Sequence, residues 1–295
     1  MINRKTVVGI GEVLWDILPE GKKLGGAPAN FAYHASQFGF RSIAVSAVGD
    51  DELGRDIISQ LQQRHLEHVI ETVDFPTGTV GVTLHAGGIP SYEIKEGVAW
   101  DNIPFSPEIE AVAKECSAVC FGSLAQRNSV SRQTIYRFLD TLPKDDSRYR
   151  IFDINLRQKF YSEEIISESM NRCNILKIND EELITVGKMF GYPDMGQQDI
   201  CRLLLSKYNL KMLILTCGAD GSYVFTPSEV SYIDTPKVEV ADTVGAGDSF
   251  TAAFVSSLLQ GKSMRQAHEC AVRVSAYICT QNGAMPILPE ELKTM

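Results

Sequence analysis

The chain has 295 residues, of which 44% are hydrophobic and 22% charged, a composition that excludes global disorder and allows a large core. Its 28 Lys and Arg residues against 37 Asp and Glu give a net charge of −9, and it has no basic block, so we expect no nucleic-acid partner. Glu12 and Asp16 interrupt any signal-peptide core, and no apolar run approaches the roughly 18 residues of a membrane span. The seven cysteines include no C-x-x-C pair, which predicts reduced thiols in a cytoplasmic protein.

The N-terminal part of the chain alternates strand and helix signals. Residues 6–12 are a short β-branched run that ends in glycines, and residues 27–39 have apolar side chains at helical spacing with Gly39 as C-cap. A second strand at 41–51 and a second helix at 51–65 follow. This β–α–β–α order is typical of a parallel sheet covered by helices.

The alternation then stops between Thr77 and Asp101, where apolar and polar residues alternate around the turn sequence "AGGIP". We interpret this stretch as a β-hairpin that projects from the main sheet. Residues 13–26 also have a strand–turn–strand pattern, and the two segments are predicted to form a small sheet over a site. The predicted domains are a β lid, residues 12–26 and 76–103, and an α/β core, residues 1–11, 27–75 and 104–295.

Strands and helices alternate again after Pro107. The predicted strands are 118–123, 148–155, 173–179 and 212–218, with an antiparallel edge pair at 222–226 and 230–234. The predicted helices are 132–142, 163–173, 180–188, 196–208, 247–260 and 264–281. The expected fold class is therefore α/β with a mostly parallel central sheet.

Polar clusters follow several of the predicted strands, where open parallel sheets bind their ligands. One such cluster is usually a turn, but this chain has five: "GEVLWD", "GSLAQR", "DINLR", "KINDEE" and "TCGADG". The number of clusters favours a ligand site along one edge of the sheet.

The stretch "GGAPANFA" has two glycines and a proline at a helix start. It could simply be a capped helix. Alternatively, Gly25 and Gly26 let the backbone approach a ligand closely, while Asn30 points into the site from the first turn. With Asp16 accepting hydrogen bonds from hydroxyls, this combination suits a polyol.

Two further motifs offer polar side chains at strand ends. In "DINLR", Asp153, Asn155 and Arg157 fall on one side if the strand persists, although a buried polar strand end is the simpler interpretation. In "NDEE", Asn179 and Glu182 are one helical turn apart, as in an ordinary N-cap. Glu182 could also hold the waters of a Mg²⁺ ion, which keeps much of its hydration shell.

The sharpest motif is "DTVGAGDSF", residues 242–250. A tight turn with Asp248 as a first-turn acid would explain it without any ligand. In the functional interpretation, the N–H groups of Gly245, Ala246 and Gly247 at a helix N-terminus bind a transferring phosphoryl group. Asp248, expected to be ionised at neutral pH, would then orient a hydroxyl and accept its proton.

Together these motifs resemble the PfkB/ribokinase-like carbohydrate kinases over nearly the whole chain, and in form they are closest to fructokinases. The resemblance rests on "GGAPANFA", "VGDDELG", "DINLR", "NDEE", "TCGADG" and "DTVGAGDSF" in that order. It implies a three-layer α/β/α sandwich with a small β-sheet lid. It also implies ATP- and Mg²⁺-dependent phosphorylation of a sugar hydroxyl.

The resemblance assigns roles residue by residue. Asp248 resembles the catalytic base, and Gly245 to Gly247 resemble the anion hole. The sugar-contacting positions correspond to Asp16, Gly25, Gly26, Asn30 and Arg157, with Tyr92 as a further contact from the lid. The nucleotide-binding positions correspond to Asn179, Glu182, Thr216, Gly218, Gly221, Asn282 and Ala284. A monovalent cation such as K⁺ beside the anion hole is implied at Asp242, although Ile287 departs from the pattern there.

The form "GGAPAN" is associated with fructokinases, which makes fructose the first expected substrate. Ribose and 2-keto-3-deoxygluconate stay open as alternatives. Adenosine also stays open, because Trp15, Phe31 and Trp100 could line a base pocket. A non-catalytic sugar or nucleotide sensor is the alternative from another class. An apolar face on the lid further predicts a homodimer formed through it.

Overall fold

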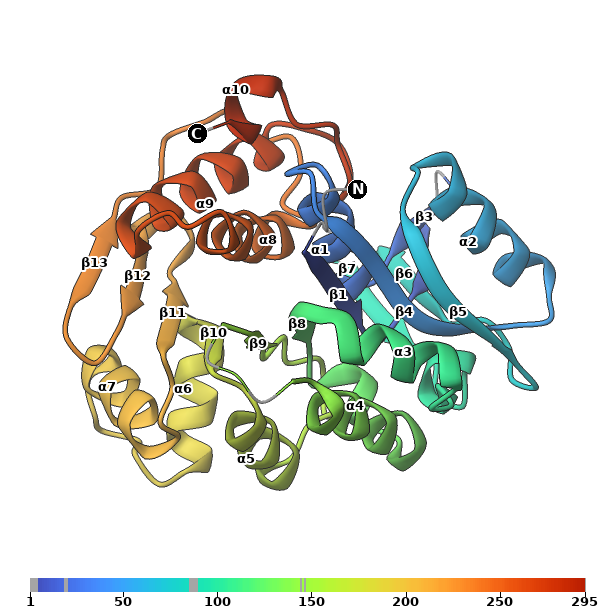
Figure 1. Ribbon diagram of the computed structural model, residues 1–295, viewed down its shortest axis with the longest axis horizontal. Helices are drawn as coiled ribbons and strands as arrows, with labels where there is room; N and C mark the ends of the chain where they lie inside the picture. The colour runs from blue at the N-terminus through green and yellow to red at the C-terminus, as the bar shows by residue number, and fades with distance from the viewer. Residues whose placement is uncertain (1–4, 19–20, 85–89, 144, 146, 295) are drawn as a thin grey trace.

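The computed structural model describes residues 5–18, 21–84, 90–143, 145 and 147–294, which form one large and one small β-sheet (Figure 1). The large sheet has the strand order β13-β12-β11-β10-β9-β8-β1-β4-β5. Its members are β1 (Thr6–Ile10), β4 (Arg41–Gly49), β5 (Glu67–Val73), β8 (Cys116–Phe121), β9 (Tyr149–Asp153), β10 (Ile175–Asn179), β11 (Met212–Thr216), β12 (Ser222–Phe225) and β13 (Val230–Ile233). All neighbours from β11 to β5 pair in parallel, whereas β12 and β13 pair antiparallel at one edge.

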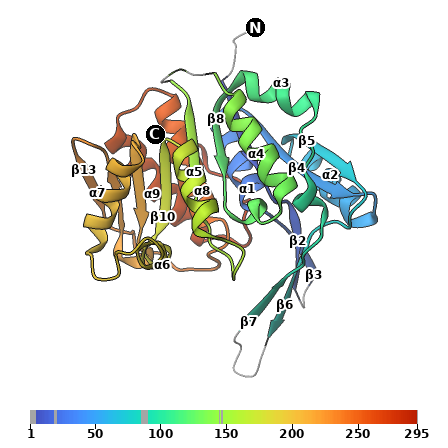
Figure 2. The ribbon, with the colours of Figure 1, turned by 90° about the horizontal axis from the view of Figure 1, so that it is seen from below.

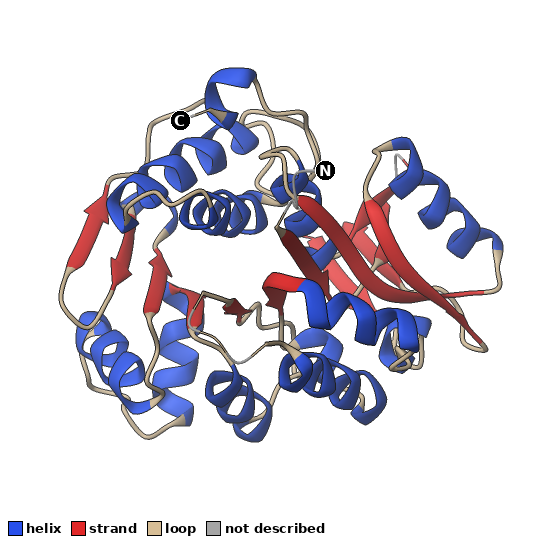
Figure 3. Ribbon diagram, in the orientation of Figure 1, coloured by secondary structure: helices blue, strands red, loops and turns tan. Residues whose placement is uncertain are grey.

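Helices cover both faces of this sheet, so the molecule has three layers (Figures 1 and 3). One face carries α3 (Pro107–Glu115), α4 (Ser129–Thr141), α5 (Glu163–Arg172), α6 (Asp180–Met189) and α7 (Gln197–Lys207). The other carries α1 (Ala27–Ser36), α2 (Glu52–Gln63), α8 (Ala246–Leu259), α9 (Met264–Cys279) and the short α10 (Glu290–Lys293). Central strands such as β1 and β8 are buried along their whole length, because both of their faces pack against helices.

Local capping explains where several of these helices begin. The Asp51 side chain accepts a hydrogen bond from the Gly54 amide and starts α2, and Ser263 and Gln266 form a capping box at the start of α9. The helix α8 begins differently, because Gly245 at its N-cap has φ 79° and no side chain caps it. Its first amides are therefore open to an external acceptor.

The small sheet has the order β3-β2-β6-β7, with β2 (Leu14–Leu18), β3 (Gly21–Gly25), β6 (Thr79–Leu84) and β7 (Pro90–Ile94). Seen from below, it projects from the α/β body (Figure 2). The strands β2 and β3 pair antiparallel, as do β6 and β7, and a parallel β2–β6 pair joins the two hairpins. This arrangement and the layered large sheet confirm the predicted fold class.

The structure differs from the sequence prediction at several elements. The strand β5 and the helix α3 were not predicted: β5 is a half-buried edge strand, and α3 is a short helix capped by Ser106 directly before β8. The prediction that Asp153, Asn155 and Arg157 share one side of a strand is wrong. The strand β9 ends at Asp153, and Asn155 has φ 47°, so the chain turns there.

The seven cysteines are unpaired in the structure, five of them buried and two half-buried. Among the helices in the described part of the chain, none has both the length and the apolarity that a membrane span needs.

Candidate active site

The predicted site residues come from the carboxyl ends of the parallel strands and from the N-termini of α1 and α8. Asp153, Asn179 and Thr216 end the strands β9, β10 and β11, and Glu12 follows β1 after one glycine. The helices α1 and α8 pack against each other on one face of the sheet. Their first turns therefore lie at the edge where these strands end.

A hydrogen bond joins the N-terminal and C-terminal motifs, which are 218 residues apart in sequence. The Asn30 amide Nδ2 donates to the Asp248 carboxylate Oδ2 over 2.8 Å. Asn30 is buried, and Asp248 is half-buried as a whole residue. The structure thus brings together the two motifs that the sequence analysis placed in one site.

The N-terminus of α8 packs against the C-terminal loop. Gly245 adopts a left-handed conformation, and a β-carbon at this position would lie 2.8 Å from the Ala284 carbonyl oxygen. The Ala246 amide donates to the Thr243 carbonyl over 3.3 Å within the turn. The amides of Gly245 and Gly247 are therefore better placed than that of Ala246 to bind an anion.

Burial raises the pKa of Asp248 to about 6, with the nearby Asp153 carboxylate adding to the effect. The Asn30 hydrogen bond and the charges of Lys177 and Arg157 act in the opposite direction. At pH 7 a pKa of about 6 still leaves about ten ionised carboxylates for each protonated one.

Glu12 is a second carboxyl group in the site, which the sequence analysis did not single out. It is only 3% exposed, and burial raises its pKa to about 7. The backbone amides of Glu12 and Ala27 and the charge of Arg157 lower this pKa, whereas the charge of Asp248 raises it, and the buried Oε2 has no hydrogen-bond partner among the described residues. A charged residue one glycine beyond the end of a fully buried strand was the signal that could have identified it.

Lys177 and Asp153 form a buried ion pair beneath the first turn of α8. They face each other in the register of β10 and β9, and Nζ donates to Oδ1 over 3.0 Å. Thr251 of α8 donates to the other carboxylate oxygen over 3.2 Å. The sequence analysis named Asp153 but missed Lys177, a single charged residue inside an apolar strand.

Asp16 lies on β2 and is half-buried. A β-carbon on Gly25, which pairs with Leu14 in the neighbouring strand, would lie 2.5 Å from the Asp16 Oδ2, and this close approach explains the glycine. At Gly26, with φ 117°, a β-carbon would collide with the Glu12 carbonyl oxygen. Arg157 is exposed, yet its charge acts on Asp16 and Asp248 alike, so the guanidinium lies near both carboxylates.

Asn179 and Glu182 form a complete capping box at the start of α6. Glu182 accepts the Asn179 amide on Oε2 and the Leu156 amide on Oε1, both over 2.9 Å. The structure therefore gives Glu182 the structural role that the sequence analysis held as the simpler interpretation. Each carboxylate oxygen keeps a second lone pair, so a water-held ion can share the group.

The other predicted nucleotide positions lie on two loops. Thr216, Gly218 and Gly221 surround the turn between β11 and β12, where Gly218 has φ 53° and Gly221 φ 97°. Asn282 and Ala284 lie in the loop after α9. Asp242 holds that loop near α8, because its two carboxylate oxygens accept the amides of Val244 and Gly283, each over 3.1 Å.

His34 of α1 contacts the loop that contains Ala284. The sequence analysis did not identify this residue. It is fully buried, which lowers its pKa to about 4, so the ring is neutral. Its Nε2 donates to the Ala284 carbonyl oxygen over 2.8 Å. Gln37 donates to the Pro286 carbonyl oxygen and accepts the Leu288 amide, which fixes the far end of the loop.

Two other features bear on the extent of the site. Tyr92 lies on β7 opposite Val82, but its side chain falls outside the described residues. In the part of the chain that the structure describes, no three acidic, histidine or cysteine side chains gather as a metal cluster.

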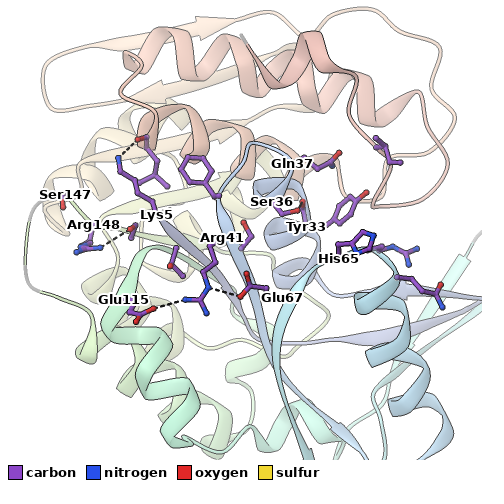
Figure 4. Close-up of a pocket in the computed structure, with 18 residues that line it drawn as sticks. Lys5, Tyr33, Ser36, Gln37, Arg41, His65, Glu67, Glu115, Ser147 and Arg148 are labelled. Atoms are coloured by element: carbon purple, nitrogen blue, oxygen red, sulfur yellow. Dashed lines mark hydrogen bonds and ion pairs between the residues drawn. The ribbon is translucent and has the colours of Figure 1, made fainter. Parts of the chain in front are cut away.

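A cavity of about 1290 Å³ lies at the opposite edge of the sheet, near the amino ends of β1, β4 and β8 (Figure 4). Its cations are already engaged: Lys5 donates to the Leu259 carbonyl oxygen, and Arg41 pairs with Glu67 and Glu115. None of the predicted site residues is among the described residues that line it. This cavity is separate from the candidate site.

Comparisons with known proteins agree on one family. The model of the pfkB family carbohydrate kinase matches residues 20–291. The ATP-dependent 6-phosphofructokinase of Thermoanaerobacterium thermosaccharolyticum is 29% identical over 96% of this chain and 91% of that protein. Probable fructokinase-4 of Arabidopsis thaliana is 27% identical over 98% and 95%.

Solved structures share the fold. An uncharacterized sugar kinase from Pyrococcus horikoshii has a TM-score of 0.80 and 27% identity, covering 95% of this chain and 94% of its own. The fructokinase of Vibrio cholerae, bound to fructose, ADP and calcium, has a TM-score of 0.81 at 24% identity, with 98% of each chain covered.

Proposed function

The chain belongs to the pfkB family of carbohydrate kinases, and on that basis we propose that it transfers the γ-phosphoryl group of ATP to a hydroxyl group of fructose. The single observation that carries the proposal is the hydrogen bond between Asn30 and Asp248. This bond joins Asn30, which we propose to contact the sugar, to an acid in the first turn of α8, where a phosphate would bind.

In the proposed mechanism, Asp248 orients the attacking hydroxyl and accepts its proton. Its pKa of about 6 leaves it ionised at pH 7 and still basic enough to take the proton late in a loose phosphoryl transfer. The amides of Gly245 and Gly247 would bind the migrating phosphoryl group. Asp16 would accept hydrogen bonds from the sugar hydroxyls, and Asn30 would hold Asp248 in place.

The nucleotide is proposed to lie between the Thr216–Gly221 turn and the loop around Ala284, which Asp242 and His34 hold in position. Magnesium bound with the nucleotide would neutralise phosphate charge, and Glu182 is the residue that we expect to hold its waters. We propose Asp242 as a ligand of a monovalent cation. The lid, with Ile17 exposed on β2, is the surface that we propose for a homodimer.

The nucleoside alternative loses its support in this structure. Trp15, Phe31 and Trp100 are each at most 4% exposed and pack into the three hydrophobic clusters of the protein. None of the three is therefore available to stack on a base. Asp248, Gly245 and Gly247 are all present and reachable from solvent, which favours an enzyme over a sensor.

Fructose 6-phosphate is a second candidate, suggested by the relative that is a 6-phosphofructokinase. The charges of Arg157 and Lys23 both act on Asp16, so two cations lie near the proposed sugar site. Such cations can hold a phosphate ester.

The test is a panel of acceptors assayed with ATP and magnesium, including fructose, fructose 6-phosphate, ribose, 2-keto-3-deoxygluconate and adenosine. Fructose should give the highest kcat/KM. A higher kcat/KM for fructose 6-phosphate would make that sugar phosphate the substrate and would leave the proposed phosphoryl transfer unchanged. No turnover of any sugar or sugar phosphate would refute the proposed function.

A further inference from the structure

The most unusual charges in the protein lie behind the proposed anion-binding turn, away from the predicted ligands. Lys177 and Asp153 are 8% and 6% exposed and lie on adjacent central strands. Burying an ammonium and a carboxylate is costly unless both are paired and hydrogen-bonded. Here the pair is made by a hydrogen bond of 3.0 Å.

This pair contacts α8 directly. A β-carbon on Gly247 would lie 3.1 Å from the Lys177 Nζ, so the ammonium packs against the backbone of the first turn. The hydroxyl of Thr251, one turn further along, lies 3.2 Å from the Asp153 Oδ2 and 3.0 Å from the Gly247 carbonyl oxygen, so its single proton is shared between these two acceptors. The strands β9 and β10 thus hold the N-terminal turn of α8 from the sheet side.

We propose that Lys177 and Asp153 are a positioning pair for the phosphoryl-transfer site, which fixes the Gly245–Gly247 turn and sets the charge that surrounds Asp248. The inference rests on the proposed kinase function. Neither residue touches a substrate in this scheme. Lys177 acts through the backbone of Gly247, Asp153 acts through Thr251, and both also act on Asp248 through their charges.

The pair has opposite signs, and so its two members have opposite effects on the base. Asp153 raises the pKa of Asp248, whereas Lys177 lowers it. Although burial disfavours its charged form, Lys177 keeps a raised pKa because three carboxylates surround it, those of Asp153, Glu182 and Asp248. The charged groups that act on Asp248 or on this pair are Glu12, Asp153, Arg157, Lys177 and Glu182.

The experiment measures kcat/KM for the sugar from pH 5 to 9, with ATP saturating and magnesium in excess for every variant. Lys177→Met should move the acid limb of the profile up by about one pH unit, and Asp153→Asn should move it down by a similar amount. The double variant, which leaves no unpaired charge, should return the limb close to the wild-type position. A purely structural pair would lower the rate without moving the limb in opposite directions.

Two controls isolate the effect. Glu12→Gln, introduced into each variant, removes the other carboxyl group that titrates in this range. Arg127→Met breaks a second buried ion pair, with Asp101 at 2.7 Å, that does not act on Asp248. This control should lower the denaturation midpoint and leave the acid limb where it is.

Limbs that stay in place in both single variants, or that move in the same direction, would overturn the inference. If Lys177→Met does not fold, the comparison of Asp153→Asn with the double variant still gives the sign of the lysine effect. A wild-type protein that phosphorylates no acceptor at any pH would instead refute the kinase proposal, so the two failures are distinguishable.

Discussion

Asn30→Ala is the variant that most clearly separates the proposed arrangement from a mere contact between two helices. It removes a buried amide that donates to a carboxylate over 2.8 Å. A hydrogen bond to a charged group contributes about 1.5–3 kcal/mol, and each 1.4 kcal/mol is a factor of ten. We therefore expect kcat/KM for the sugar to fall by about 10- to 150-fold at pH 8.

The same variant should change the pH dependence. The Asn30 hydrogen bond lowers the pKa of Asp248, so its loss should move the acid limb of kcat/KM upwards from about pH 6. The assay is coupled detection of ADP with the sugar varied. Asn128→Ala is the matched control, because Asn128 caps α4, and its loss should cost about 1 kcal/mol of stability without moving the limb. A kcat/KM within twofold of wild type and an unmoved limb would refute the reasoning.

Three further predictions concern stability and assembly. Because the folded-state pKa of Glu12 is about 7 against an ordinary 4.5, its contribution to stability is full below pH 4.5 and is lost as the pH rises through 7. The free energy of unfolding of Glu12→Gln, measured by urea denaturation, should therefore rise relative to that of the wild-type protein by on the order of 3 kcal/mol between pH 5 and 8. A difference in unfolding free energy that does not change with pH would contradict this. Gly245→Ala places a β-carbon 2.8 Å from the Ala284 carbonyl oxygen, so about 1–3 kcal/mol of stability and much of the ATP affinity should be lost, as denaturation and calorimetric titration would show. Light scattering should find a dimer for wild type and a monomer for Ile17→Asp, and a monomeric wild type would rule out the lid interface.

The parts of the fold that sequence analysis predicted are those with strong local signals. Residues 118–123 and 212–218 are buried runs between turn signals, and the hairpin around residues 77–101 alternates apolar and polar positions. The strand β5 was missed because "EHVIETV" lies at an edge of the sheet, where pairing with β4 decides the conformation more than the sequence does.

The site residues that lie in recognisable sequence motifs were predicted. The residues whose role depends on tertiary contacts were missed. Asn30 and Asp248 were both named, but their hydrogen bond joins positions 218 residues apart, and only the tertiary fold reveals it. The sequence could have indicated a buried ion pair at Lys177, because a single lysine in a buried strand requires an acidic side chain beside it. The αL turn at Asn155 has no such signal, and the strand pattern of "DINLR" therefore misled the prediction.

The central claim is that Asp248 deprotonates the acceptor beside an anion-binding helix N-terminus. Its most direct test is the turnover of Asp248→Ala with ATP and the best sugar of the acceptor panel, with ATP affinity measured in parallel. The proposed mechanism predicts a fall in kcat of about 10²–10⁴-fold with ATP binding largely intact. Turnover equal to that of the wild-type protein would contradict it.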